Sequence, residues 1–192
     1  MENIKRHILW ASLIIVLVGC TAASEEIRVK SRCEKKDVFS ESVKEPIPSG
    51  MAELHIRTSI KIKLERQFVR ESSIAGRGYP FLMNIDGQAA TWRVGGQRER
   101  NGETRHERGE GLTYILERKL TLFAGSHKIF FGLPEEDTFV QFDVTMEEGQ
   151  SYVLEFKPFY GECITGHKKF SHGVNRLGVL LNGNPICPQT NG

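Results

Sequence analysis

Three residues near the C-terminus combine ligand chemistry with close spacing. Cys163, His167 and His172 supply one thiol and two imidazoles. Zinc usually takes four such ligands, or three and a water molecule when the site is catalytic. The spacing matches no strong zinc motif, and a disulfide cysteine beside two exposed histidines accounts for the same residues. We therefore expect no metal here and keep a small periplasmic metal-dependent hydrolase only as an alternative.

Other polar residues have types that suit acid–base chemistry, but their surroundings favour structural roles. No serine or cysteine nucleophile motif accompanies His127, so its imidazole is expected to cap backbone groups in a turn. Residues 135–137 are acidic and follow Pro134, which predicts a solvated turn rather than a calcium site. His55 is expected at the surface. We assign no catalytic residue and expect no cofactor. Four aromatic residues suit a sugar- or peptide-binding face but are more often core residues: Tyr114, Phe130, Phe131 and Phe159.

The N-terminus has the layout of an export signal that ends at a cysteine. A basic start precedes the apolar residues 8–18, a run shorter than the roughly 20 residues of a membrane-spanning helix. The sequence Leu17-Val18-Gly19-Cys20 resembles the lipobox of bacterial lipoproteins. A plain secretory signal and an uncleaved membrane anchor are the alternatives.

The lipobox resemblance implies removal of residues 1–19 and attachment of diacylglycerol to Cys20, whose new N-terminus is then acylated, for example with palmitate. Several acyl chains on one residue would give a stable anchor without a transmembrane helix. In many such lipoproteins an aspartate after the cysteine favours the inner membrane. Thr21 stands there instead, so the resemblance implies the outer membrane, with the domain facing the periplasm.

Composition limits the remaining possibilities. Removing the signal leaves 173 of the 192 residues and changes the net charge from +2 to +1, because the signal holds two cations and one anion. This length suits one domain, and a nearly neutral surface argues against a nucleic-acid partner. With Cys20 acylated, three cysteines remain, and an oxidising periplasm favours one disulfide. We favour Cys163 with Cys187, while Cys33 could pair instead.

A period-two pattern predicts the fold. Residues 52–65 alternate apolar and polar side chains, which indicates a half-buried β-strand with one solvated face. Asp86-Gly87 between two β-rich runs is typical of a hairpin. Further β-rich runs lie at 112–123, 128–131, 140–146, 152–156 and 174–181, and no amphipathic helix of useful length follows residue 20. We predict an all-β fold, an antiparallel β-sandwich of about seven strands.

Two polar segments are expected outside the core. Residues 20–50 are rich in charge, which predicts a flexible tether that follows the lipidated cysteine and precedes a sandwich domain at 51–192. Residues 95–111 hold four arginines, four glutamates and no large apolar side chain. They predict a mobile loop. A solvated hairpin extension is favoured over a functional loop.

Residues 79–160 resemble PEGA-type and related transthyretin-like β-sandwich modules. The resemblance rests on the segment from Phe81 to Gly87, on Leu122-Phe123-Ala124-Gly125-Ser126-His127-Lys128-Ile129, and on Glu148-Gly149 followed by Tyr152-Val153-Leu154-Glu155. Such modules are usually noncatalytic and occur in envelope and carbohydrate-associated proteins. The resemblance therefore implies a noncatalytic binding or scaffolding module, with an envelope protein or a glycan as partner. The second alternative is an accessory subunit of an export, polysaccharide or motility machine.

Overall fold

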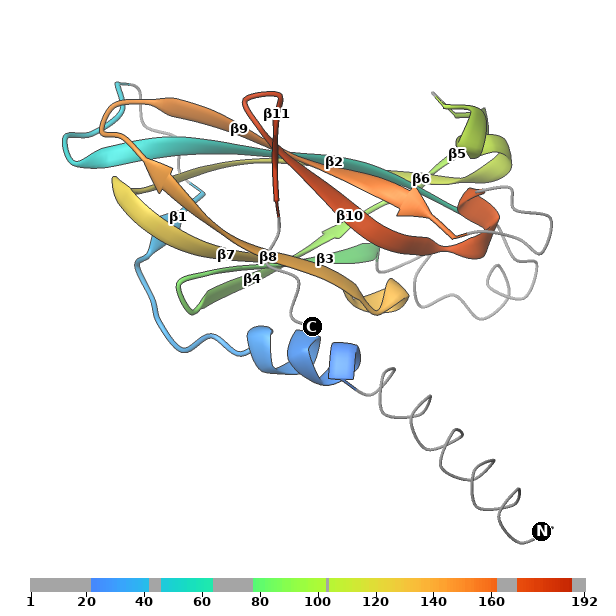
Figure 1. Cartoon of the computed structure of the whole chain (residues 1–192), viewed down its shortest axis with the longest axis horizontal. Coiled ribbons are helices and arrows are strands. Elements are labelled where there is room, and N and C mark those ends of the chain that lie inside the picture. Colours follow the sequence, from blue (N-terminus) through green and yellow to red (C-terminus); the bar gives the residue numbers. More distant parts are fainter. Residues whose placement is uncertain (1–21, 42–45, 64–77, 103, 162–168, 188–192) are drawn as a thin grey trace, which may run out of the picture.

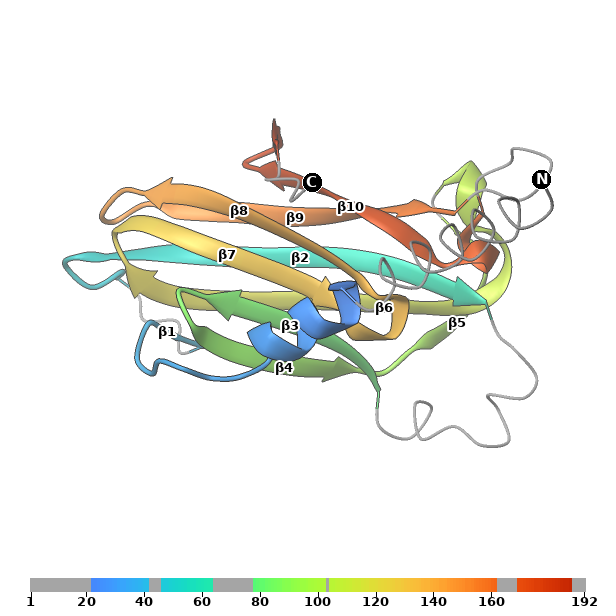
Figure 2. The same cartoon turned by 60° about the horizontal axis from the view of Figure 1, so that its bottom comes forward.

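The chain folds into two packed β-sheets. The computed structural model describes residues 22–41, 46–63, 78–102, 104–161 and 169–187. Sheet A has the order β1-β6-β2-β9-β10-β11, with β5 also paired to β6, and sheet B has the order β4-β3-β7-β8. The sheets form two layers, and a short helix lies on the far side of sheet B (Figure 1; Figure 2). Sheet A holds β1 (Phe39–Ser40), β2 (Met51–Lys63), β5 (Gln97–Asn101), β6 (Arg108–Phe123), β9 (Ser151–Tyr160), β10 (Val174–Leu181) and β11 (Asn184–Ile186), and sheet B holds β3 (Tyr79–Ile85), β4 (Gln88–Val94), β7 (Gly125–Leu133) and β8 (Thr138–Met146).

The predicted β-sandwich is confirmed, with differences in detail. The described residues form eleven strands, because short strands extend the edges of sheet A. One strand pair, β2 with β9, is parallel. The Asp86-Gly87 hairpin is also confirmed. It is a two-residue turn in which both residues have positive φ, the geometry that suits the twist of paired strands.

The core lies between the sheets. The inward side of β2 contributes Leu54, Ile56 and Ile60, each fully buried, as the alternation predicts. Phe131 of sheet B stacks on Phe156 of sheet A, with ring centres 3.8 Å apart. Aromatic burial of this kind makes the largest side-chain contribution to packing. The two sheets are therefore joined mainly by apolar contacts.

The segment expected as a mobile loop, 95–111, has regular structure where it is described. It contains β5, the 3₁₀ turn η1 (Arg105–Glu107) and the first residues of β6. β5 pairs with β6, so the favoured hairpin extension is what forms. The polar composition is accommodated because the strand pairing satisfies the backbone, which needs no apolar side chain.

The segment expected as a flexible tether, 20–50, is ordered in part. Residues 22–30 form a helix, and β1 pairs with β6. The helix was not predicted. No helix within the described residues is long and apolar enough to cross a membrane.

Candidate functional site: a polar pocket at the N-terminal junction

The helix of residues 22–30 is fixed to the outer face of sheet B. Ile27 is buried against Leu82 of β3 and Phe130 of β7. At one end of the helix the Ser24 hydroxyl donates to Asp137 Oδ1 at 2.7 Å, and at the other end the Asn84 amide donates to the Lys30 carbonyl at 2.8 Å. Nine residues rarely hold a helix alone in water, so these contacts account for its formation.

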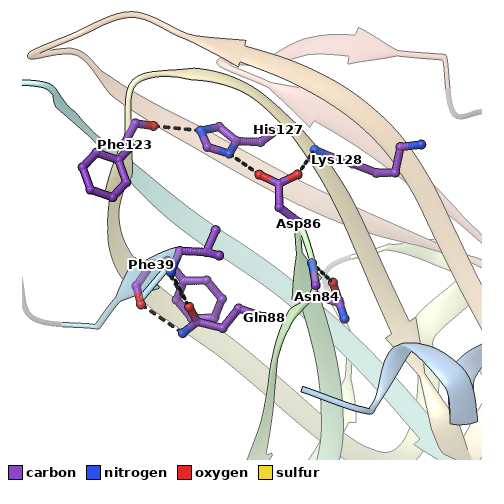
Figure 3. Close-up of polar contacts among 9 residues, drawn as sticks. Phe39, Asn84, Asp86, Gln88, Phe123, His127 and Lys128 are labelled. Carbon is purple, nitrogen blue, oxygen red and sulfur yellow. Dashed lines mark hydrogen bonds and ion pairs between the residues drawn. The ribbon is translucent and has the colours of Figure 1, made fainter. Parts of the chain in front are cut away.

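The β3–β4 hairpin holds the chain that follows the helix. The Gly87 carbonyl accepts from the backbone N–H groups of Glu34 and Lys35. Gln88 Oε1 accepts from the backbone N–H of Val38 (2.6 Å) and of Phe39 (3.1 Å), and its amide donates to the Phe39 carbonyl (Figure 3). One glutamine thus replaces the strand partner that β1 lacks on this side.

His127 of β7 ties the same hairpin to the β6–β7 turn. Its Nδ1 lies 2.7 Å from Asp86 Oδ2, and its Nε2 lies 2.7 Å from the Phe123 carbonyl (Figure 3). Both ring nitrogens therefore face oxygen acceptors. Asp86 Oδ1 also accepts from the backbone N–H of Lys128. The prediction that His127 caps backbone groups is confirmed, and both oxygens of Asp86 are occupied.

A pocket of about 510 Å³ opens between this N-terminal segment and sheet B. We call it the junction pocket. Four cationic and two anionic side chains line it: Lys30, Arg32, Lys35 and Lys128, with Glu34 and Asp86. Four cations against two carboxylates give the lining a net positive charge, although Lys30 also lies 3.9 Å from Glu26 outside the lining. Lysine and arginine in such a place suit a phosphate or carboxylate ligand.

A second polar cluster is closed. We call it the closed end, and it consists of Lys61, Glu107, Tyr160 and Phe170 at one end of sheet A. Lys61 is 1 % exposed. Its Nζ donates to the Glu107 carbonyl at 2.8 Å and lies 5.0 Å from the centre of the Phe170 ring. The Tyr160 hydroxyl donates to Glu107 Oε1 at 2.7 Å and accepts from the Lys61 backbone N–H. These side chains bond to one another and to backbone, which is a structural role.

Burial shapes the electrostatics near the closed end. It raises the pKa of Tyr160, and the hydrogen bond to Glu107 raises that pKa further. Burial also raises the pKa of Tyr79, whose hydroxyl is buried without a hydrogen-bond partner among the described residues. Glu136 accepts from the Val174 backbone N–H, but its burial raises its pKa. Tyr79 and Tyr160 therefore stay neutral in the folded protein well above pH 10.

Several predicted site residues lie outside the described part of the chain. Cys20, Cys163 and His167 are among them, so lipidation and the Cys163–Cys187 pairing stay predictions. Cys33 and Cys187 are exposed free thiols in this structure. His172 is exposed in η3 (Phe170–His172). Within the described ranges no three metal-binding side chains come together.

The other singled-out residues fall in three places. His55 lies on the outer face of sheet A, where its Nε2 is 2.6 Å from Glu53 Oε1. The acidic turn is less solvated than expected, because Glu136 in η2 (Pro134–Glu136) holds the start of β10 and Asp137 holds Ser24. Of the four aromatic residues, Tyr114, Phe130 and Phe131 are buried as expected, whereas Phe159 is exposed beneath the Arg176 guanidinium.

The sequence reasoning missed both polar clusters. Lys61 occupies a position of β2 that alternation assigns to solvent, and the distant residues Glu107 and Phe170 cover it. For the junction pocket a signal was present in β3. All seven residues of Tyr79–Ile85 are buried, so apolar side chains on both faces, such as Leu82 beside Phe81, indicated that something covers sheet B.

Comparison with protein-family models, with curated proteins and with solved structures finds no match to this chain.

Proposed function

We propose that this chain is a bacterial lipoprotein, held at the outer membrane by an acylated Cys20 and facing the periplasm. The observation that carries the proposal is Leu17-Val18-Gly19-Cys20 after a basic and apolar start. Acyl chains on this cysteine would supply the affinity, at about 0.8 kcal/mol for each buried CH₂. The membrane is then the first partner.

The sandwich acts in this proposal as a noncatalytic binding or scaffolding module. Support comes from the way the acid–base residues are used, since His127, Asp86, Tyr160 and Lys61 all bond to backbone groups. The lining of the junction pocket has more cationic than anionic side chains. An envelope protein or a glycan is the further partner that this proposal names, and it includes no nucleic acid and no cofactor.

Acyl labelling in bacterial cells tests the anchor. Cells expressing the protein are fed an alkyne-tagged fatty acid, and the purified protein is examined for the tag and for its N-terminus. We expect Cys20→Ala to abolish the tag and to leave residues 1–19 attached, whereas Cys33→Ala, the matched control, keeps the tag. A tagged Cys20→Ala protein would overturn the assignment.

A further inference from the structure

The helix of residues 22–30 leaves almost no spacer after Cys20. A chain spans at most about 3.6 Å per residue, so the Cα atoms of Cys20 and Ala22 are no more than about 7 Å apart. From Ala22 onward the helix is held by Ile27, by Ser24 and by the bond from Asn84. An anchor at Cys20 would therefore hold the domain close to the bilayer by the outer face of sheet B.

The charge around this face complements phosphate. Lys30, Arg32, Lys35 and Lys128 line the junction pocket. Lysine and arginine side chains near an anionic membrane surface are attracted to its phosphate groups. Val29, on the same helix, is an exposed apolar side chain, which suits the boundary between headgroups and acyl chains.

The outer face of sheet A differs. On this face Arg57 lies 3.8 Å from Glu117 and Lys157 lies 3.6 Å from Glu155, whereas of the pocket's four cations Lys30 has such a neighbour, Glu26 at 3.9 Å. Matched charges of this kind give little net attraction to an anionic surface. Sheet A is also the layer farther from the helix (Figure 1).

We propose that the helix of residues 22–30 and the junction pocket form the membrane-facing surface, on which the cations meet phospholipid headgroups while sheet A faces away. This inference rests on the lipidation of Cys20 proposed above. It replaces a domain on a long tether by a domain with a fixed orientation.

Two labelled forms of the full lipidated protein test the orientation. Both carry Cys163→Ser and Cys187→Ser. One is labelled with a fluorophore at the native Cys33, beside the pocket, and the other at Ser59→Cys in a Cys33→Ser background, on the exposed face of β2. They are placed in vesicles of phosphatidylethanolamine and phosphatidylglycerol with a nitroxide on the headgroup. We expect quenching at Cys33 to be at least about twofold stronger than at Ser59→Cys.

The outcomes separate the two proposals. If the protein carries no acyl chain and does not float with the vesicles, the lipoprotein proposal fails, and this inference fails with it. If the protein floats but both labels are quenched equally, or the Ser59→Cys label more, the anchor stands and the orientation is wrong.

Two sets of variants sharpen the result. Ile27→Asp should release the helix and bring the quenching ratio toward one. Because Ile27 belongs to a small cluster apart from the main core, the main core should stay folded. Arg32→Ala with Lys35→Ala should lower the ratio in anionic vesicles and leave it unchanged in phosphatidylcholine. Arg57→Ala with Lys157→Ala is the matched control, and an equal effect of this pair would contradict the role of charge.

Discussion

The junction and the closed end both cover the outer face of a sheet, and they do so in opposite ways. At the closed end, two 3₁₀ turns bury Lys61 completely and use its ammonium group for a backbone carbonyl. At the junction, a helix attached by one apolar side chain leaves four cations around an open pocket. Lysine is therefore structural at the closed end, whereas the lysines at the junction are available to a ligand. Burial, rather than residue type, separates the surface suited to binding from the surface that only stabilises.

The largest effect is expected at the closed end. Phe170→Ala should lower the free energy of unfolding by about 3–5 kcal/mol, because Phe170 is buried in the main core and covers Lys61. Denaturant unfolding of the purified domain measures this. Phe123→Ala is the control. Its side chain is 56 % exposed, and the carbonyl that accepts from His127 survives the substitution, so the loss should stay below about 1 kcal/mol. Equal losses would show that the closed end is not a stabilising element.

Two buried tyrosines should respond to loss of the hydroxyl with opposite signs. Tyr160→Phe removes the partner of the Lys61 backbone N–H and should lower the free energy of unfolding by about 1–3 kcal/mol. Tyr79→Phe removes a buried hydroxyl that has no partner among the described residues and should raise it by about 1 kcal/mol. Denaturant unfolding at neutral pH measures both, and a destabilised Tyr79→Phe protein would contradict the assignment.

The same two residues set the response to alkaline pH. Burial raises the pKa of Tyr160 and of Tyr79 above the value of about 10 in an unfolded chain. Stability is unaffected by these groups' titration below pH 10 and falls as the pH rises above it, because the unfolded state releases the protons first. The loss of stability between pH 10 and pH 11 should be shallower in Tyr160→Phe than in the unsubstituted protein.

The sequence predicted what local pattern determines. The alternation in residues 52–65 identified β2 and its core side, and Asp86-Gly87 identified the hairpin. The sequence did not predict burial that depends on residues far apart in the chain. Nothing near Lys61 indicates that Glu107 will cover it, and only Ile27 in the mixed-charge helix carries an apolar signal toward Leu82. The apolar residues on both faces of β3 did indicate that sheet B is covered. Composition did not identify the segment that covers it.

The smallest global effect and the clearest local one are expected at the junction. Gln88→Ala removes three hydrogen bonds to Val38 and Phe39 at the edge of the sandwich. Because the apolar contacts of Val38 and Phe39 with the main core remain, the free energy of unfolding should fall by only about 1 kcal/mol, while local opening exposes these backbone N–H groups. Native-state hydrogen exchange should therefore speed up at Val38 and Phe39 and stay unchanged at Lys61. Tyr160→Phe should give the reverse pattern. If either substitution accelerated exchange at both ends, the junction and the closed end would be one cooperative unit rather than two regions that open separately.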